Sequence, residues 1–182
     1  MKSKEIIETV EVPQGNEVFL INNTIIVKGV KGEIKKDFSC FGIKLKKENS
    51  KIFFSIKGVS RRQKCVINSC LSHFKNMING VNFGYIYKLK VCSSHFPINI
   101  SIDKNRLIIK NFLGEKIPRA AEILDGVNVK IDGDVIIVDG IDKEKTGQVS
   151  ANIERATNIT HRDRRVFQDG IHMTEKSSKI IK

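Results

Sequence analysis

The sequence predicts an α+β protein built from two tandem copies of a small antiparallel sheet packed on one helix, with a basic C-terminal tail. An internal repeat carries this prediction, because the chain matches itself at an offset of 82 residues, position 22 lying over position 104. NNTIIVKGVKGE (22–33) lies over KNRLIIKNFLGE (104–115), and KIFFSIKGVSRRQKCVINS (51–69) lies over GDVIIVDGIDKEKTGQVSA (133–151). The second observation is that each copy combines short β-branched runs with one amphipathic helical stretch.

The repeat also divides the chain. A length of 182 residues with 40% hydrophobic residues is enough to bury a core in each of two small domains. We expect a first sheet-plus-helix module at 1–80, a second at 81–159, and a basic C-terminal tail at 160–182.

The first module begins with strands. NEVFLIN (16–22) and TIIVKGV (24–30) are β-branched runs separated by Asn22-Asn23, a pair typical of hairpin turns. IKLKKENSKIFFSIK (43–57) has two strand-like pieces about a polar turn. Similar meanders are expected in the second module.

A helix is expected after each set of strands. Ser60 with Gln63 three residues later forms a capping box, which predicts a helix start. Apolar residues then recur at 3-to-4 spacing as far as Ile78, and basic and polar residues lie mostly on the other face. In the second module, Asp142 is the expected N-cap of a helix with a thinner apolar stripe that includes Val149.

The join between the modules is a basic strand. The alternation in YIYKLKV (85–91) places tyrosine and aliphatic side chains on one face and Lys88 and Lys90 on the other. Pro97 predicts that any strand after it is interrupted or at an edge. A basic strand face next to a basic helix face would make a surface and not a cleft.

The charge points to a polyanionic partner. The chain has 32 Lys and Arg against 20 Asp and Glu, a formal net charge of +12. No carboxylate occurs between Glu48 and Asp103, whereas a solvated surface normally mixes both signs. We therefore expect a face that meets phosphates.

The cysteines and the chain start indicate a reducing compartment. The four cysteines, at 40, 65, 70 and 92, form no C-x-x-C pair, and the opening MKSKEIIETVEV has no apolar stretch typical of a signal peptide. The longest apolar runs are around five residues, so we expect no membrane span. We expect a soluble intracellular protein.

Residues that could perform chemistry are poorly arranged. Cys92 and His95 could be a nucleophile and a base, but no third orienting group lies nearby in sequence, and three residues on an extended segment do not bring them together. His161 and His172 lack further metal ligands. We expect no enzyme activity, no metal, no cofactor and no small-molecule substrate.

Several motifs resemble one family. TIIVKGVKGEIKKDF (24–38), NMINGVNFGYIYKLKVCSSHFPINI (76–100) and IKNFLGEK (109–116) are similar to segments of the universal ribosomal protein six family of the large subunit, called protein nine in eukaryotic nomenclature, in its eukaryotic and archaeal form. The resemblance covers nearly the whole chain.

The C-terminal region resembles the signature of the same family. The positions that satisfy it are Ile159, Arg162, Arg164, Phe167, Asp169, Gly170, Ile171, Met173 and Lys176. Two positions depart from it: Arg155 stands where the family has Gln, and His172 where it has Tyr or Phe. Neither change removes positive charge or the Asp-Gly pair.

The resemblance implies a function. Members of this family bind large-subunit rRNA near the base of the factor-binding stalk and close to the sarcin-ricin loop, beside other large-subunit proteins, and support translation structurally. It implies a ribonucleoprotein of the cytoplasm, assembled in the nucleolus if the source is eukaryotic. A free RNA-binding module away from the ribosome is the alternative, and a cysteine hydrolase using Cys92 and His95 is a third hypothesis.

The candidate rRNA contacts are basic or aromatic side chains from three places. They are Arg61, Arg62 and Lys64 at the first helix start, Lys88, Lys90 and His95 on and beside the linking strand, and Arg155, Arg162, Arg164, Arg165, Phe167 and Lys176 toward the C-terminus. Arginine favours bidentate phosphate contacts. We expect a tail that is disordered alone and ordered on rRNA, with Phe167 as an apolar anchor and Asp169-Gly170 as a turn.

Overall fold

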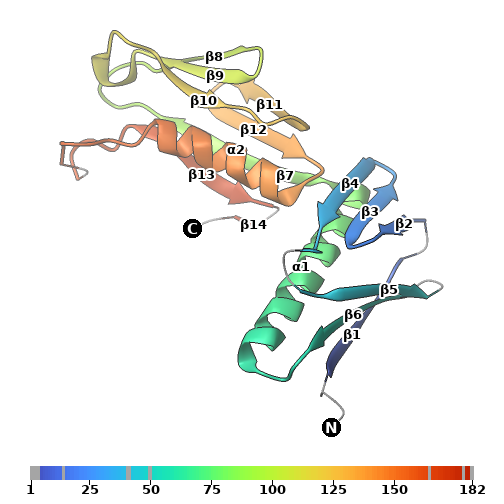
Figure 1. Cartoon of the computed structure of the whole chain (residues 1–182). Coiled ribbons are helices and arrows are strands. Elements are labelled where there is room, and N and C mark those ends of the chain that lie inside the picture. Colours follow the sequence, from blue (N-terminus) through green and yellow to red (C-terminus); the bar gives the residue numbers. More distant parts are fainter. Residues whose placement is uncertain are drawn as a thin grey trace. The chain divides into compact units, whose positions relative to one another are not determined.

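The computed structural model divides the chain into two compact units, Met1–Phe83 and Gly84–Lys182 (Figure 1). The sequence places this division at residue 80. The structure describes residues 5–13, 15–39, 42–48, 51–163, 165–177 and 179–180. No helix within these ranges is long and apolar enough to span a membrane.

Unit 1 contains two antiparallel three-stranded sheets and one helix. Its elements are β1 (Glu5–Glu11), β2 (Glu17–Ile21), β3 (Thr24–Gly29), β4 (Gly32–Asp37), β5 (Lys44–Glu48), β6 (Lys51–Lys57) and α1 (Arg61–Phe83). The sheet orders are β2-β3-β4 and β1-β6-β5.

The first helix begins where the sequence predicts. The Ser60 N–H donates to Gln63 Oε1 at 2.9 Å, and the Gln63 N–H donates back to Ser60 Oγ at 3.4 Å. This reciprocal pair satisfies two donors that the helix start would otherwise leave unpaired, so the capping box is confirmed. Beneath α1, the ring of Phe54 on β6 lies 5.8 Å from the ring of Phe74, and both side chains are fully buried.

Unit 2 repeats this plan and extends it. Its elements are β7 (Tyr85–Cys92), β8 (Asn99–Asp103), β9 (Arg106–Lys110), a 3-10 turn (Phe112–Gly114), β10 (Arg119–Glu122), β11 (Val127–Asp132), β12 (Val135–Gly140), α2 (Lys143–Ala156), β13 (Gly170–Lys176) and β14 (Lys179–Ile180). The sheet orders are β8-β9-β10 and β11-β12-β7-β13-β14. Asp142 caps α2 as expected, since its carboxylate accepts the Glu144 N–H at 2.9 Å.

The two units therefore match element by element. Strands β1, β2–β4, β5 and β6 and helix α1 correspond to β7, β8–β10, β11 and β12 and helix α2, in the same chain order and with the same sheet orders. The predicted α+β class and the tandem duplication are confirmed, with two small sheets in each copy instead of one.

The C-terminal strand β13 is the main departure from the sequence analysis. It pairs antiparallel with β7, with Gly170 opposite Cys92 and Ile171 opposite Val91, and a bulge follows Met173. Ile171 is completely buried. The expectation of a disordered tail is wrong for Gly170–Lys176, because the apolar residues on one side of this segment complete the core next to β7.

Candidate nucleic-acid interface

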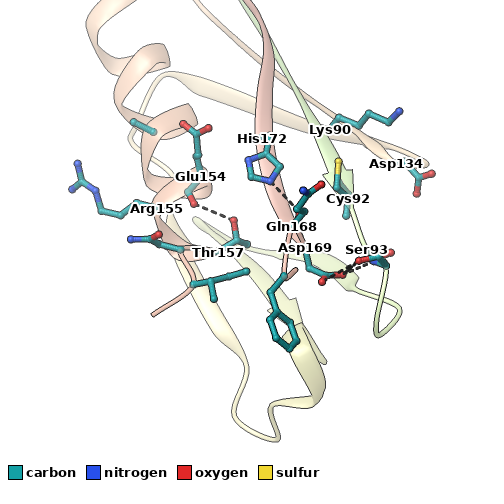
Figure 2. A pocket seen from close by; sticks show the side chains of 16 residues that line it. Lys90, Cys92, Ser93, Asp134, Glu154, Arg155, Thr157, Gln168, Asp169 and His172 are labelled. Atoms are coloured by element: carbon teal, nitrogen blue, oxygen red, sulfur yellow. Dashed lines mark hydrogen bonds between the residues drawn. The ribbon is translucent and has the colours of Figure 1, made fainter. Parts of the chain in front are cut away.

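An open hollow lies on unit 2 where three parts of the chain meet (Figure 2). Lys90 and Cys92 come from the end of β7, Glu154 and Arg155 from the last turn of α2, and His172 from β13. Alternation on β7 places these groups, since Tyr87 and Leu89 face the core while Lys90 faces solvent. The hollow is thus bounded by regular elements on all three sides.

One buried carboxylate fastens the loop after β7 to the segment before β13. The Asp169 side chain is 1% exposed. It accepts the backbone N–H of Ser94, the backbone N–H of His95 at 3.1 Å and the Ser94 hydroxyl at 3.2 Å, and its Oδ2 lies 2.5 Å from His95 Nδ1. We call this set of contacts the Asp169 clasp.

The clasp holds Asp169 in its charged form. Burial by itself raises the pKa of this carboxyl group, but the hydrogen bonds from Ser94 and His95 together lower it more, to about 2. Asp169 is therefore ionised at neutral pH, and its charge is used inside the chain.

The clasp is not a catalytic relay. Ser94 Oγ lies 3.1 Å from His95 Nδ1, the same ring nitrogen that faces Asp169. A serine-histidine-aspartate relay uses opposite ring nitrogens for the nucleophile and the carboxylate. The arrangement instead positions a loop.

A stack of three side chains lies beside the clasp. The rings of His95 and Phe167 have centroids 4.7 Å apart with an angle of 25° between their planes. The guanidinium carbon of Arg162 lies 4.8 Å from the centre of the Phe167 ring. Phe167, expected as an anchor on RNA, is thus half-buried between two groups of its own chain.

Gly170 does not form the expected turn. It is the first residue of β13, and its backbone does not have the positive φ that a glycine turn requires. A Cβ atom at this position would lie 3.0 Å from His172 Nε2. The expectation of an Asp169-Gly170 turn is corrected, because Gly170 is needed for space next to a strand and Asp169 for its hydrogen bonds.

The candidate basic residues of unit 2 fall into two groups. Lys88 is paired with Glu175 at 2.7 Å, and Arg165 with Asp163 at 3.1 Å. Exposed cations without an acidic partner in the described residues are Lys90, Arg155, Arg162 and Lys176. Arg164 lies outside the described residues. The second group is available for an external anion.

The candidates of unit 1 lie together on the first turn of α1. Arg61, Arg62 and Lys64 are exposed, and α1 contains no carboxylate over its whole length. They form a separate basic group on that unit.

Sequence reasoning missed Ser94, Thr157 and Arg119. Thr157 Oγ1 accepts the Ile171 N–H at 3.0 Å, which ties the end of α2 to β13. Arg119 donates to the carbonyl oxygens of Ala156 and Asn158 at 2.9 and 3.0 Å, just past the last turn of α2. Their partners are 14 to 75 residues distant in sequence, so no local pattern marks them.

Metal binding finds no support in the part of the chain that the structure describes. Within it, no group of three or more His, Cys, Asp or Glu side chains could hold a metal ion. His172 Nε2 instead lies 3.4 Å from the backbone oxygen of Gln168.

Comparison with known proteins agrees with these observations. Residues 96–170 match the family described as "Ribosomal protein L6". A protein of Sulfurisphaera tokodaii named "Large ribosomal subunit protein uL6" is 46% identical over 177 residues, which cover 97% of this chain and 95% of that protein. Proteins of the same name from Aeropyrum pernix and Methanococcus vannielii are 42% and 40% identical, and each alignment covers 96% of this chain and 97% and 96% of the relatives.

Proposed function

The chain belongs to the uL6 family of large ribosomal subunit proteins, and from that premise we propose that it binds rRNA as a structural component of the large subunit. The observation that carries this proposal is the group of exposed cations on unit 2, Lys90, Arg155, Arg162 and Lys176, which have no acidic partner among the described residues. Structured RNA is recognised largely through its phosphates and 2′-hydroxyl groups, for which such cations are suited.

The surface is held in place before any RNA binds. The Asp169 clasp fixes the loop at Ser94 and His95, and the stack on Phe167 fixes Arg162. A group that is already ordered loses less conformational entropy on binding, so each contact contributes more to affinity. Arginine side chains can in addition form two parallel hydrogen bonds to one phosphate.

The finer location is also part of the proposal. We propose contacts near the base of the factor-binding stalk and close to the sarcin-ricin loop, with other large-subunit proteins alongside, in cytoplasmic ribosomes. In a eukaryotic source, assembly would take place in the nucleolus. The first-turn cations of α1 and the residues Lys88, Arg164 and Arg165 are weaker candidates for direct contact.

Co-sedimentation with large subunits tests the proposal. The full chain should sediment with them in a sucrose gradient and remain bound at moderate salt. The double substitution Arg155→Glu and Arg162→Glu should release most of the protein at a salt concentration that the wild type withstands. The control is Lys130→Glu, a similar charge change on exposed β11, at the other end of the same sheet.

Two results would contradict the proposal. A wild-type protein found only at the top of the gradient would favour a free RNA-binding module. Equal release of the Lys130 variant and the double variant would show that net charge, and not this surface, determines binding.

A further inference from the structure

Strand β1 of unit 1 has an edge that its counterpart in unit 2 does not leave open. Strand β7 pairs with β12 on one side and with β13 on the other, whereas in the described residues β1 pairs only with β6 (Figure 1). β1 is seven residues long, so its outer edge presents a row of backbone N–H and C=O groups.

The internal repeat shows which position of β1 corresponds to which position of β7. Phe54 lies opposite Glu8 on β1, and Ile136, 82 residues further along, lies opposite Leu89 on β7. Glu8 therefore occupies the place of Leu89. Leu89 is fully buried and faces Met173 of the added strand β13, while Glu8 is exposed.

The flanking positions are also incompletely covered in unit 1. Ile6 and Val10 are only half-buried, although their partners on β6, Ile56 and Ile52, are buried. On the opposite face of the strand, Ile7 is 60% exposed. An additional strand would cover apolar surface on both faces of β1.

The edge is acidic in a strongly basic protein. β1 carries Glu5, Glu8 and Glu11 and no Lys or Arg, against a net charge of +12 for the chain. Glu11 is paired with Lys51 at 2.9 Å, and Glu5 lies opposite Lys57. Glu8 lies opposite a phenylalanine and has no cation across the strand pair.

We propose that the outer edge of β1 binds an extended basic segment of another protein through main-chain hydrogen bonds. The segment places Lys or Arg opposite Glu8 and apolar residues opposite Ile6 and Val10. This is strand addition to a sheet edge, in which the backbone supplies affinity and alternate side chains supply specificity. The inference does not depend on RNA binding.

Charge excludes a second copy of this chain as the occupant. Antiparallel self-pairing centred on Glu8 places Glu8 against Glu8 and Glu5 against Glu11, and like charges directly opposite each other are destabilising. Glutamates at an edge protect it against self-association for the same reason. They attract a cationic strand, and they repel RNA phosphates.

Fluorescence anisotropy on the full chain tests the proposal with two labelled nine-residue peptides. Both alternate Val and Thr, and they differ only in a central Lys or a central Glu. We expect the Lys peptide to bind the wild type at least tenfold more tightly, and Glu8→Lys to reverse the preference. The control Glu17→Lys makes the same change on exposed strand β2 of the same unit and should leave the preference as in the wild type. Far-UV circular dichroism verifies that the variants fold.

Hydrogen exchange locates the contact. Binding of the Lys peptide should protect alternate amides of Glu5–Glu11 and leave the amides of β13 unchanged. The proposal is overturned by equal affinities for the two peptides, by no binding, by a preference that Glu8→Lys does not reverse, or by protection away from β1. Concentration-dependent pairing of full-length chains through β1, or protection of β1 by poly(U), would also overturn it.

Discussion

The substitution Asp169→Asn tests the clasp that holds the proposed interface together. The carboxyl pKa falls from 3.8 to about 2 in the folded chain, although burial alone would raise it, because Ser94 and His95 donate hydrogen bonds to the charged form. At about 1.4 kcal/mol per pKa unit, the ionised group contributes about 2 kcal/mol to the free energy of unfolding. The neutral amide loses this contribution.

The pH dependence follows from the sign of the shift. A lowered pKa in the folded state means that the contribution is complete above the ordinary pKa of 3.8 and is lost as the pH falls toward about 2. The stability difference between wild type and Asp169→Asn should therefore be largest at pH 5 to 7 and shrink below about pH 4.

Tyrosine fluorescence makes the measurement specific to unit 2. The chain has two tyrosines and no tryptophan, and both tyrosines, Tyr85 and Tyr87, lie on β7. In urea titrations at pH 7, Asp169→Asn should unfold with a free energy lower by about 2 kcal/mol, and its Tm should fall by about 10 °C for a unit of about 100 residues. The control Asp163→Asn, an exposed carboxylate paired with exposed Arg165, should change far less.

One result would refute this reasoning. If Asp169→Asn and wild type have the same tyrosine-detected stability at pH 7, the buried hydrogen bonds to Asp169 do not stabilise unit 2. A stability loss that is independent of pH from 7 to 3 would show that the carboxylate charge is not its cause.

Two further substitutions test how β13 and α2 are held. Ile171→Ala should lower the stability of unit 2 by about 2 to 4 kcal/mol because it empties a fully buried position, and limited proteolysis should then cut near β13 earlier than in wild type; a protease pattern and stability equal to those of the exposed control Val166→Ala would contradict the pairing. Arg119→Ala should cost about 1 to 3 kcal/mol because the carbonyls of Ala156 and Asn158 lose their donor, and Arg119→Lys should recover little, since a single ammonium cannot reproduce the fork; full recovery by Lys in tyrosine-detected urea unfolding would argue against it.

The features that the sequence predicted correctly depend on local periodicity. Alternation alone places Tyr85, Tyr87 and Leu89 on the buried face of β7, and the Ser60 and Gln63 pair marks the start of α1. Both signals are complete within a few residues of the chain. The duplication is likewise visible because each copy carries its own period.

The features that the sequence did not predict depend on long-range pairing. Gly170 lies opposite Cys92, 78 residues earlier, and GIHMTEK has too few apolar residues to be recognised as a strand by itself. The same applies to charge, because Lys88 pairs with Glu175 across two strands. A count of basic residues therefore overestimates the number of cations available to RNA.

The duplication also explains why the two units can differ in what they bind. Each copy inherits a sheet whose first strand is an edge, and in unit 2 the chain covers that edge with β13, which buries Leu89 and places Lys90 and His172 side by side. In unit 1 the described chain supplies no such strand, and the position of Leu89 carries Glu8. The same edge thus becomes a basic surface in one copy and an acidic one in the other. A polyanion is favoured at the first and a cationic segment at the second, so a single ancestral module accounts for two opposite binding preferences.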